Sequence, residues 1–256
     1  MRLLQLQLKL AYVQEFKKFY ESTVYPELQK LSGCLFAGLI KSTTQQDEFI
    51  SITFWETQSQ AEQYDKIGAF KNLFEKAKIF LSDSSEWKVQ LSENMELQYG
   101  PVNEEPVIKK YVVTTQNEEG VKRLTTSSNM FVRVLSLIIQ DDKVEEFKKL
   151  YTGIVMPALK ATKGCKYVFL TESVNSINEF ISVTIWDRKE DADEYEFEGK
   201  SQELNNKVKH TYSQLYLWGM SLAKENVTKV KTSDDFKVEH YNMITGKSFN
   251  NIGNKK

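Results

Sequence analysis

The sequence has few of the residues from which disulfide scaffolds and metal sites are built. Its 256 residues include two cysteines, four prolines and two histidines. Two cysteines in so long a chain do not make a disulfide framework. The sequence contains no P-loop, GxGxxG, HExxH or paired-cysteine motif, so flavin, nicotinamide and zinc are not indicated. We therefore expect no cofactor and no metal.

Long apolar runs and an excess of one charge are also missing. No run approaches the about 18 apolar residues of a membrane helix, and the apolar residues of the N-terminal segment alternate with polar ones, unlike those of a signal peptide. The formal net charge of -1 gives no basic excess for nucleic acid or an anionic membrane. We expect a cytoplasmic, reduced protein with neither nucleic acid nor a membrane as partner.

The chain contains an internal repeat. The segment Glu48-Phe-Ile-Ser-Ile-Thr-Phe-Trp55 recurs 131 positions later as Glu179-Phe-Ile-Ser-Val-Thr-Ile-Trp186. With this offset the two halves align without a gap from Val13/Val144 to Trp87/Trp218, which predicts one fold made twice. The predicted divisions are a first repeat at 1–92, a linker or arm with an extra strand at 93–130, a second repeat at 131–222, and a C-terminal arm at 223–256 whose end is disordered.

Within the first repeat, apolar periodicity predicts six elements. Leucines at every second position over 4–10 indicate a strand, and helical spacing indicates a helix over about 12–31 that bends near Pro26. Strands at 34–40 and 49–55 form a hairpin, Thr57 or Ser59 caps a helix that breaks at Gly68, and Trp87–Leu91 is the fourth strand. The order β-α-β-β-α-β predicts a ferredoxin-like α+β unit with helices on one sheet face. The second copy is the simplest cover for the other face.

The Phe-Ile-Ser-Ile-Thr-Phe-Trp strand, the acidic residue after it (Glu56, Asp187), the capped helix and the second helix after a glycine resemble the antibiotic biosynthesis monooxygenase (ABM) family of dimeric α+β barrel proteins. The resemblance covers 1–92 and 131–222. It implies two antiparallel sheets packed face to face as a pseudo-dimer within one chain, a cavity between sheet and helices in each half, and further self-association as an option. It also implies activities that include cofactor-free oxygenation of aromatic substrates and oxidative haem degradation.

Family site positions can be compared one at a time. The position nine residues after the strand-end tryptophan, where the family commonly has histidine or tryptophan, holds Tyr64 and Tyr195. The iron-ligating histidine of the haem-degrading branch falls on Phe74 and Asn205, which cannot ligate haem iron as a neutral imidazole does. The resemblance therefore argues against haem degradation.

The resemblance makes Trp55, Tyr64, Phe74, Trp186, Tyr195 and Asn205 the candidate ligand-binding residues, while the catalytic residues are unknown. A large aromatic packed in the core is the alternative for each ring. His210 and His240 are more readily explained as solvated or structural, and Cys34 and Cys165 as small buried hydrophobes. We expect a protein that binds a small hydrophobic or aromatic molecule, with cofactor-independent monooxygenation as one activity. The alternative is a non-catalytic structural or interaction module.

Overall fold

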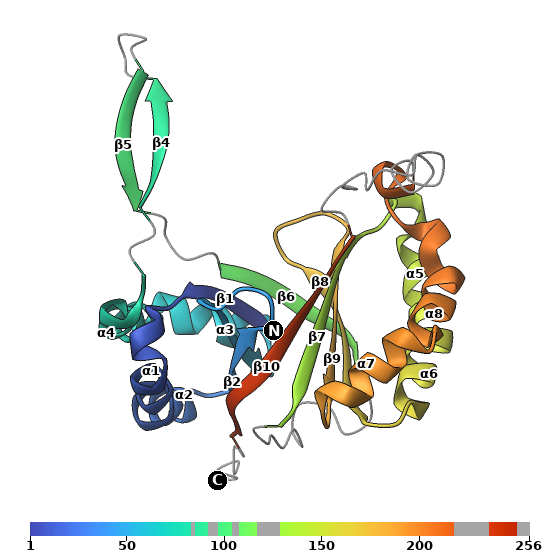
Figure 1. The fold of residues 1–256 in the computed structure, drawn as a ribbon, viewed down its shortest axis with the longest axis horizontal. Helices are drawn as coiled ribbons and strands as arrows, with labels where there is room; N and C mark the ends of the chain where they lie inside the picture. The colour runs from blue at the N-terminus through green and yellow to red at the C-terminus, as the bar shows by residue number, and fades with distance from the viewer. Residues whose placement is uncertain (83–84, 92–96, 104–107, 117–128, 218–235, 250–256) are drawn as a thin grey trace.

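A computed structural model describes residues 1–82, 85–91, 97–103, 108–116, 129–217 and 236–249. The two halves have the same order of elements, and Figure 1 shows their helices on opposite outer sides of a central sheet. The first half comprises β1 (Arg2–Gln7), α1 (Val13–Phe19), α2 (Tyr25–Gln29), β2 (Cys34–Ser42), β3 (Glu48–Trp55), α3 (Gln58–Lys66) and α4 (Ala69–Ala77). The second comprises β7 (Phe131–Ile138), α5 (Val144–Leu150), α6 (Met156–Ala161), β8 (Cys165–Ser173), β9 (Glu179–Trp186), α7 (Lys189–Phe197) and α8 (Lys200–Val208).

The bend predicted near Pro26 is a π-helical turn. It spans Tyr20–Val24 between α1 and α2, and Tyr151–Val155 repeats it between α5 and α6. The proline of each half follows in the first turn of the next helix, where its missing N–H has no intrahelical partner to lose. Such turns inside helices are frequent at functional sites because they rotate side chains out of the regular helical register.

The break between the third and fourth helices is set by glycine. Gly68 and Gly199 have φ of 75° and 82° immediately before α4 and α8, a left-handed conformation that side chains with a Cβ rarely adopt. Thr57 caps α3 through a reciprocal capping box with Gln60. The predicted hairpins and helices therefore form at the predicted places.

Eight antiparallel strands close into a barrel in the order β1-β3-β2-β10-β7-β9-β8-β6. Two of them join the halves: β6 (Ile108–Gln116) pairs with β1 and β8, and β10 (Phe236–Ser248) pairs with β2 and β7. Each half is thus a four-stranded antiparallel sheet whose fourth strand also pairs with the other half. This confirms the predicted intrachain α+β barrel.

The prediction for the fourth strand was wrong. Residues Ser85–Leu91 do form a strand, β4, but it pairs with β5 (Leu97–Asn103) in a separate two-stranded sheet, drawn away from the barrel in Figure 1. The fourth-strand positions belong to β6 and β10, which the sequence predicted only as extra strands or arms. Periodicity identified the strand but could not reveal its pairing partner, because pairing is decided between segments distant in sequence. The disordered end predicted within 223–256 lies beyond residue 249, outside the described residues.

Alternation along the strands separates three cores. Leu3, Ile52 and Phe54 point into the barrel with residues of the second half, and the rings of Phe54 and Phe169 are 4.9 Å apart between centroids. Leu4 and Leu6 point outward to the first half's helices, and a third cluster repeats this arrangement in the second half. A ligand site can therefore lie inside the barrel or between a sheet and its helices.

Candidate functional site

Equivalent cavities lie between sheet and helices in the two halves. Their volumes are about 40 Å³ in the first half and about 50 Å³ in the second, room for one or two water molecules rather than for a drug-sized ligand. Residues 131 positions apart line them. The first cavity is lined by Arg2, Tyr20, Ser51, Tyr64, Phe70 and Phe74 among others, and the second by Arg133, Tyr151, Ser182, Tyr195, Ser201 and Asn205.

A buried arginine from the first strand supplies the charge in the first cavity. Arg2 is 3% exposed, and its guanidinium lies 4.1 Å from the ring centroid of Phe70 and 5.2 Å from that of Tyr64. One terminal nitrogen, Nη2, is 3.3 Å from Asp65 Oδ1. Its Nε is buried with no hydrogen-bond partner among the described residues. A buried donor without an acceptor is costly, so Arg2 lacks one anionic or polar neighbour.

The second half satisfies the same nitrogen. Arg133 Nε lies 2.5 Å from Glu196 Oε1, and His240 Nε2 lies 3.1 Å from the same oxygen. In the first half the corresponding carboxylate, Asp65, pairs with Lys110 at 2.7 Å. Because Asp is one methylene shorter than Glu, it reaches only a terminal nitrogen of its arginine. The two halves therefore have the same arrangement of residues but differ in whether the arginine Nε has a hydrogen-bond partner among the described residues.

A tyrosine and a serine form the second polar feature of each cavity. Tyr20, which begins the first π-helical turn, has its hydroxyl 2.7 Å from Ser51 Oγ, and Tyr151 lies 2.6 Å from Ser182 Oγ. Burial raises the pKa of both phenols above the ordinary value. These hydroxyls consequently remain protonated at neutral pH and can donate or accept hydrogen bonds, but they do not act as bases there.

The predicted tryptophans do not line either cavity. Trp55 and Trp186 are 8% and 0% exposed, and each indole N–H donates to a threonine two residues earlier in its strand. Each ring packs on the predicted tyrosine, with centroids 5.3 Å apart for Tyr64 and 5.2 Å for Tyr195. The tyrosines do line the cavities. The tryptophans thus support rings that could meet a ligand.

The remaining two predicted residues also line the cavities and make the halves chemically different. Phe74 stacks on Phe70 with centroids 5.7 Å apart, which gives the first cavity an aromatic outer wall. Asn205 instead accepts a hydrogen bond from Tyr212 at 2.6 Å, and Ser201 stands at the position of Phe70. The first cavity therefore has fewer polar residues in its lining than the second. It also contains the arginine whose Nε has no hydrogen-bond partner among the described residues.

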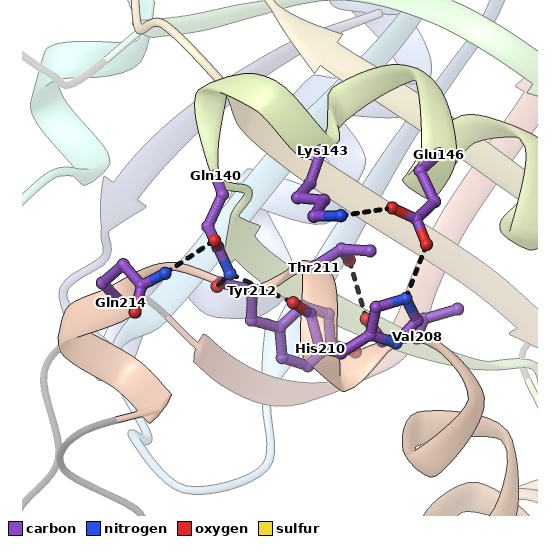
Figure 2. A network of polar contacts seen from close by, with 8 residues as sticks. All are labelled: Gln140, Lys143, Glu146, Val208, His210, Thr211, Tyr212 and Gln214. Carbon is purple, nitrogen blue, oxygen red and sulfur yellow. Dashed lines mark hydrogen bonds and ion pairs between the residues drawn. The ribbon is translucent and has the colours of Figure 1, made fainter.

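Neither histidine lies in a cavity wall. His210 is 49% exposed, and its Nε2 is 2.9 Å from Glu146 Oε1 (Figure 2). Nearby, the Gln140 amide donates to the carbonyl oxygens of His210 and Tyr212 at 3.0 and 2.7 Å. These contacts fasten the turn after α8 to the start of α5. His240 stacks on Phe131 and pairs with Glu196, outside the lining of both cavities.

Cys34 is buried and Cys165 is partly buried, and neither thiol is reactive. Burial raises the pKa of Cys34 and of Cys165 to about 12, so the nucleophilic thiolate is scarce at neutral pH. Among the described residues no group of three or more His, Cys, Asp or Glu side chains could hold a metal ion. The described chain also has no helix long and apolar enough to span a membrane.

Sequence reasoning missed Arg2, Tyr20 and Ser51 with their counterparts in the second half. The signal was available, because arginine, tyrosine and serine recur unchanged at the 131-residue offset while other positions vary. The strand predicted from the alternating leucines began at residue 4, so that prediction did not include Arg2. Arg2 is buried because the rings of Tyr64 and Phe70, on helices distant in sequence, pack against its guanidinium.

Comparison with known proteins identifies the first half. Residues 2–76 match the family model described as Antibiotic biosynthesis monooxygenase. The match thus runs from β1 into α4. The resemblance predicted from the sequence is thereby confirmed. A search among curated proteins found no match.

Solved structures cover nearly the whole chain. A "putative monooxygenase" from Lactobacillus acidophilus NCFM aligns with a TM-score of 0.60 and 9% identity over 96% of this chain and 94% of its own. One of the same description from Fusobacterium nucleatum subsp. nucleatum ATCC 25586 gives 0.61 and 9% over 96% and 93%. An anthrone oxidase-like protein gives 0.56 and 7% over 97% and 92%. At these identities the likeness shows the fold alone.

The second half's ion pair gives a prediction for stability. Burial alone would raise the pKa of Glu196, but hydrogen bonds from His240 and Arg133 outweigh it and lower the pKa to about 2. A lowered carboxylate pKa stabilises the fold above the unfolded pKa of about 4.5, and this stabilisation disappears as the pH falls toward 2. We expect Glu196→Gln to cost up to about 3 kcal/mol of unfolding free energy at pH 7 and little at pH 2.

Urea unfolding of wild type and variant across this pH range measures the difference. Glu198→Gln is the control, because Glu198 is exposed and its ion pair is with a surface lysine, Lys200. An equal loss at pH 7 and pH 2 would contradict the electrostatic origin of the effect.

Proposed function

We propose that this ABM-like protein binds a small hydrophobic or aromatic molecule carrying an anionic oxygen in the cavity of its first half. The observation that carries the proposal is the buried Nε of Arg2, which has no acceptor among the described residues, together with the place of Arg2 in the lining of a cavity whose other residues are mainly apolar. A ligand oxygen would satisfy that donor and add a charge-assisted hydrogen bond. The apolar body of the ligand would lie against Phe70 and Phe74.

The cavity must enlarge for such a ligand, since about 40 Å³ is far below the roughly 300 Å³ at which small-molecule pockets begin. The aromatic wall is the part suited to move. Phe70 and Phe74 are only partly buried and lie on α4, which begins after the left-handed Gly68. A planar ligand inserted between these rings and the sheet would replace their stacking with its own. Binding is therefore proposed to displace α4 side chains and leave the strands in place.

Cofactor-independent oxygenation is a second candidate, and the same arginine favours it. Stabilising the enolate of an aromatic ketone lowers its pKa, and an enolate can pass electrons to O₂ without a cofactor. Combination at carbon forms a peroxide, and loss of one water leaves a new carbonyl, so that a CH₂ group plus O₂ becomes C=O plus H₂O. The tyrosines of the cavity stay protonated, so the substrate must be acidic enough to ionise beside Arg2. Anthrone fits this description, and a protein of like fold is named anthrone oxidase-like.

Calorimetric titration with 2-naphthoate and its neutral isostere 2-naphthamide tests the binding proposal. We expect one site per chain and at least about tenfold tighter binding of the anion, because a hydrogen bond to a buried charged group contributes about 1.5–3 kcal/mol. Equal affinity for the two probes, or no binding of either, would contradict the proposal. Oxygen consumption with anthrone, measured beside a protein-free control, then tests oxygenation separately. Binding without oxygen uptake would support the non-catalytic alternative.

A further inference from the structure

A third and larger cavity lies at one end of the barrel interior. Its volume is about 300 Å³, within the range of small-molecule pockets. It is separate from the first sheet–helix cavity, because alternate residues of β1 face opposite ways: Leu3 and Gln5 line this cavity, whereas Arg2 and Leu4 line the first sheet–helix cavity. Strands of both halves contribute walls, and so do the two joining strands β6 and β10. We call it the barrel-end cavity.

The charged lining of the barrel-end cavity is unbalanced. Three glutamates and two lysines contribute, and two ion pairs use both lysines: Lys109 lies 3.6 Å from Glu179, and Lys237 lies 2.6 Å from Glu239. The remaining carboxylate is Glu48, the first residue of the repeated strand motif. The cavity therefore carries one negative charge more than its lysines balance when all three carboxylates are ionised.

Glu48 is also the most buried of these carboxylates. It is 5% exposed, and the two side chains that hydrogen-bond to it are neutral: Gln5 Nε2 at 3.2 Å and the Tyr241 hydroxyl at 3.4 Å. Its counterpart Glu179 has both a tyrosine donor, Tyr111 at 3.0 Å, and the Lys109 ammonium. The pseudo-symmetric halves thus hold equivalent glutamates. Among the described residues, Glu179 has a lysine within ion-pair distance, whereas Lys237 acts on Glu48 only as a more distant charge.

Burial first, and the neighbouring Glu239 second, raise the pKa of Glu48 above its ordinary value. A raised carboxylate pKa stabilises the fold only at low pH and costs stability as the pH rises through it. A residue that costs folding stability at neutral pH and faces a cavity is typical of a site kept for a ligand. A cation beside Glu48 would remove that cost.

We propose that the barrel-end cavity binds a small organic ammonium ion, with its charged group on Glu48 and its apolar body along the barrel wall. The wall offers Leu3, Ile50, Val134 and Ile181 for the apolar part. The described residues provide no cluster of ligands for a metal ion here, and a bare inorganic cation would leave these apolar side chains unused. The site is independent of Arg2 and of the proposed function.

Three probes of one shape test this inference on the whole protein: benzylammonium, benzyl alcohol and benzoate. In calorimetric titrations at pH 7.5 we expect benzylammonium to bind at least about tenfold more tightly than the neutral alcohol, and benzoate not to bind. Glu48→Gln preserves the shape of the side chain and removes its charge, and should abolish the preference for the ammonium ion. Glu179→Gln is the matched control and should retain most of it, because Glu179 is already paired with Lys109.

Acidification gives a readout that needs no variant. Glu48 faces Gln5 from β1 and Lys237, Glu239 and Tyr241 from β10, with Glu179 and Lys109 across the cavity. Because the pKa of Glu48 is raised, benzylammonium affinity in the wild type should fall in mildly acidic buffer, where the probe itself stays protonated. Equal binding of benzylammonium and benzyl alcohol, or an unchanged preference in a folded Glu48→Gln protein, would overturn the inference. Loss of binding only in the Glu179→Gln variant would do so too.

Discussion

Replacing Arg2 by methionine is expected to weaken 2-naphthoate binding by about 10- to 100-fold while leaving 2-naphthamide binding nearly unchanged. Methionine keeps much of the apolar volume beside Tyr64 and Phe70 but removes the donor that the ligand oxygen would use. The affinity for 2-naphthamide thus measures the contribution of the apolar cavity. The difference in affinity between 2-naphthoate and 2-naphthamide measures the contribution of the guanidinium. Calorimetry on the variant and the wild type gives both values.

The duplication supplies the control for this variant. Arg133→Met makes the same change at the equivalent position, where Glu196 already accepts from the arginine Nε, and it should change 2-naphthoate affinity by less than about threefold. Both variants should fold, because Asp65 keeps Lys110 as a partner and Glu196 keeps His240. Equal weakening by both variants would show that both halves bind the anion. No weakening by either would place the ligand elsewhere.

Local sequence patterns predicted the elements of each half because those elements depend on neighbours in sequence. The alternating leucines of β1, the capping box at Thr57 and the left-handed Gly68 act within a few residues. The repeat then predicted two equal units, and the need to cover each sheet predicted the barrel. These inferences require no knowledge of which distant segments meet.

The site was only half predictable for the opposite reason. Tyr64 follows its strand at a fixed spacing, so the resemblance could point to it, but its relation to Arg2 depends on α3 folding back over β1. Likewise, one of the two side chains that donate a hydrogen bond to Glu48 is Tyr241, 193 residues away. The side chains of Asp65 and Glu196 differ by one methylene group. This difference affects hydrogen bonding only because the fold places each carboxylate beside an arginine. Whether a buried charged group has a hydrogen-bond or ion-pair partner depends on segments that meet only in the folded protein.

Removing β10 is expected to abolish cooperative folding. β10 pairs with β2 on one edge and with β7 on the other, so a chain ending at residue 217 would open the barrel and expose two strand edges. It would also uncover the barrel core around Tyr241 and Met243, which are 1% and 3% exposed. Two such side chains contribute about 1.5–3 kcal/mol each, and the lost ladders add to this. The total is comparable with the about 5–15 kcal/mol that stabilises an ordinary domain.

The hairpin β4–β5 provides the contrasting deletion. It pairs only with itself in the described structure, so replacing residues 85–103 by a short glycine–serine linker should leave a cooperative thermal transition. The chain that ends at residue 217 and lacks β10 should instead aggregate through its open strand edges. Adding a peptide of residues 236–249 to this chain during refolding should restore part of its thermal transition. Retained cooperative unfolding after loss of β10, or its loss after removal of the hairpin, would contradict this assignment. Both deletions remove sequence that lies outside the β-α-β-β-α core of the repeats. A difference in their effect on folding would therefore come from strand pairing, which links β10 to the barrel but not the hairpin.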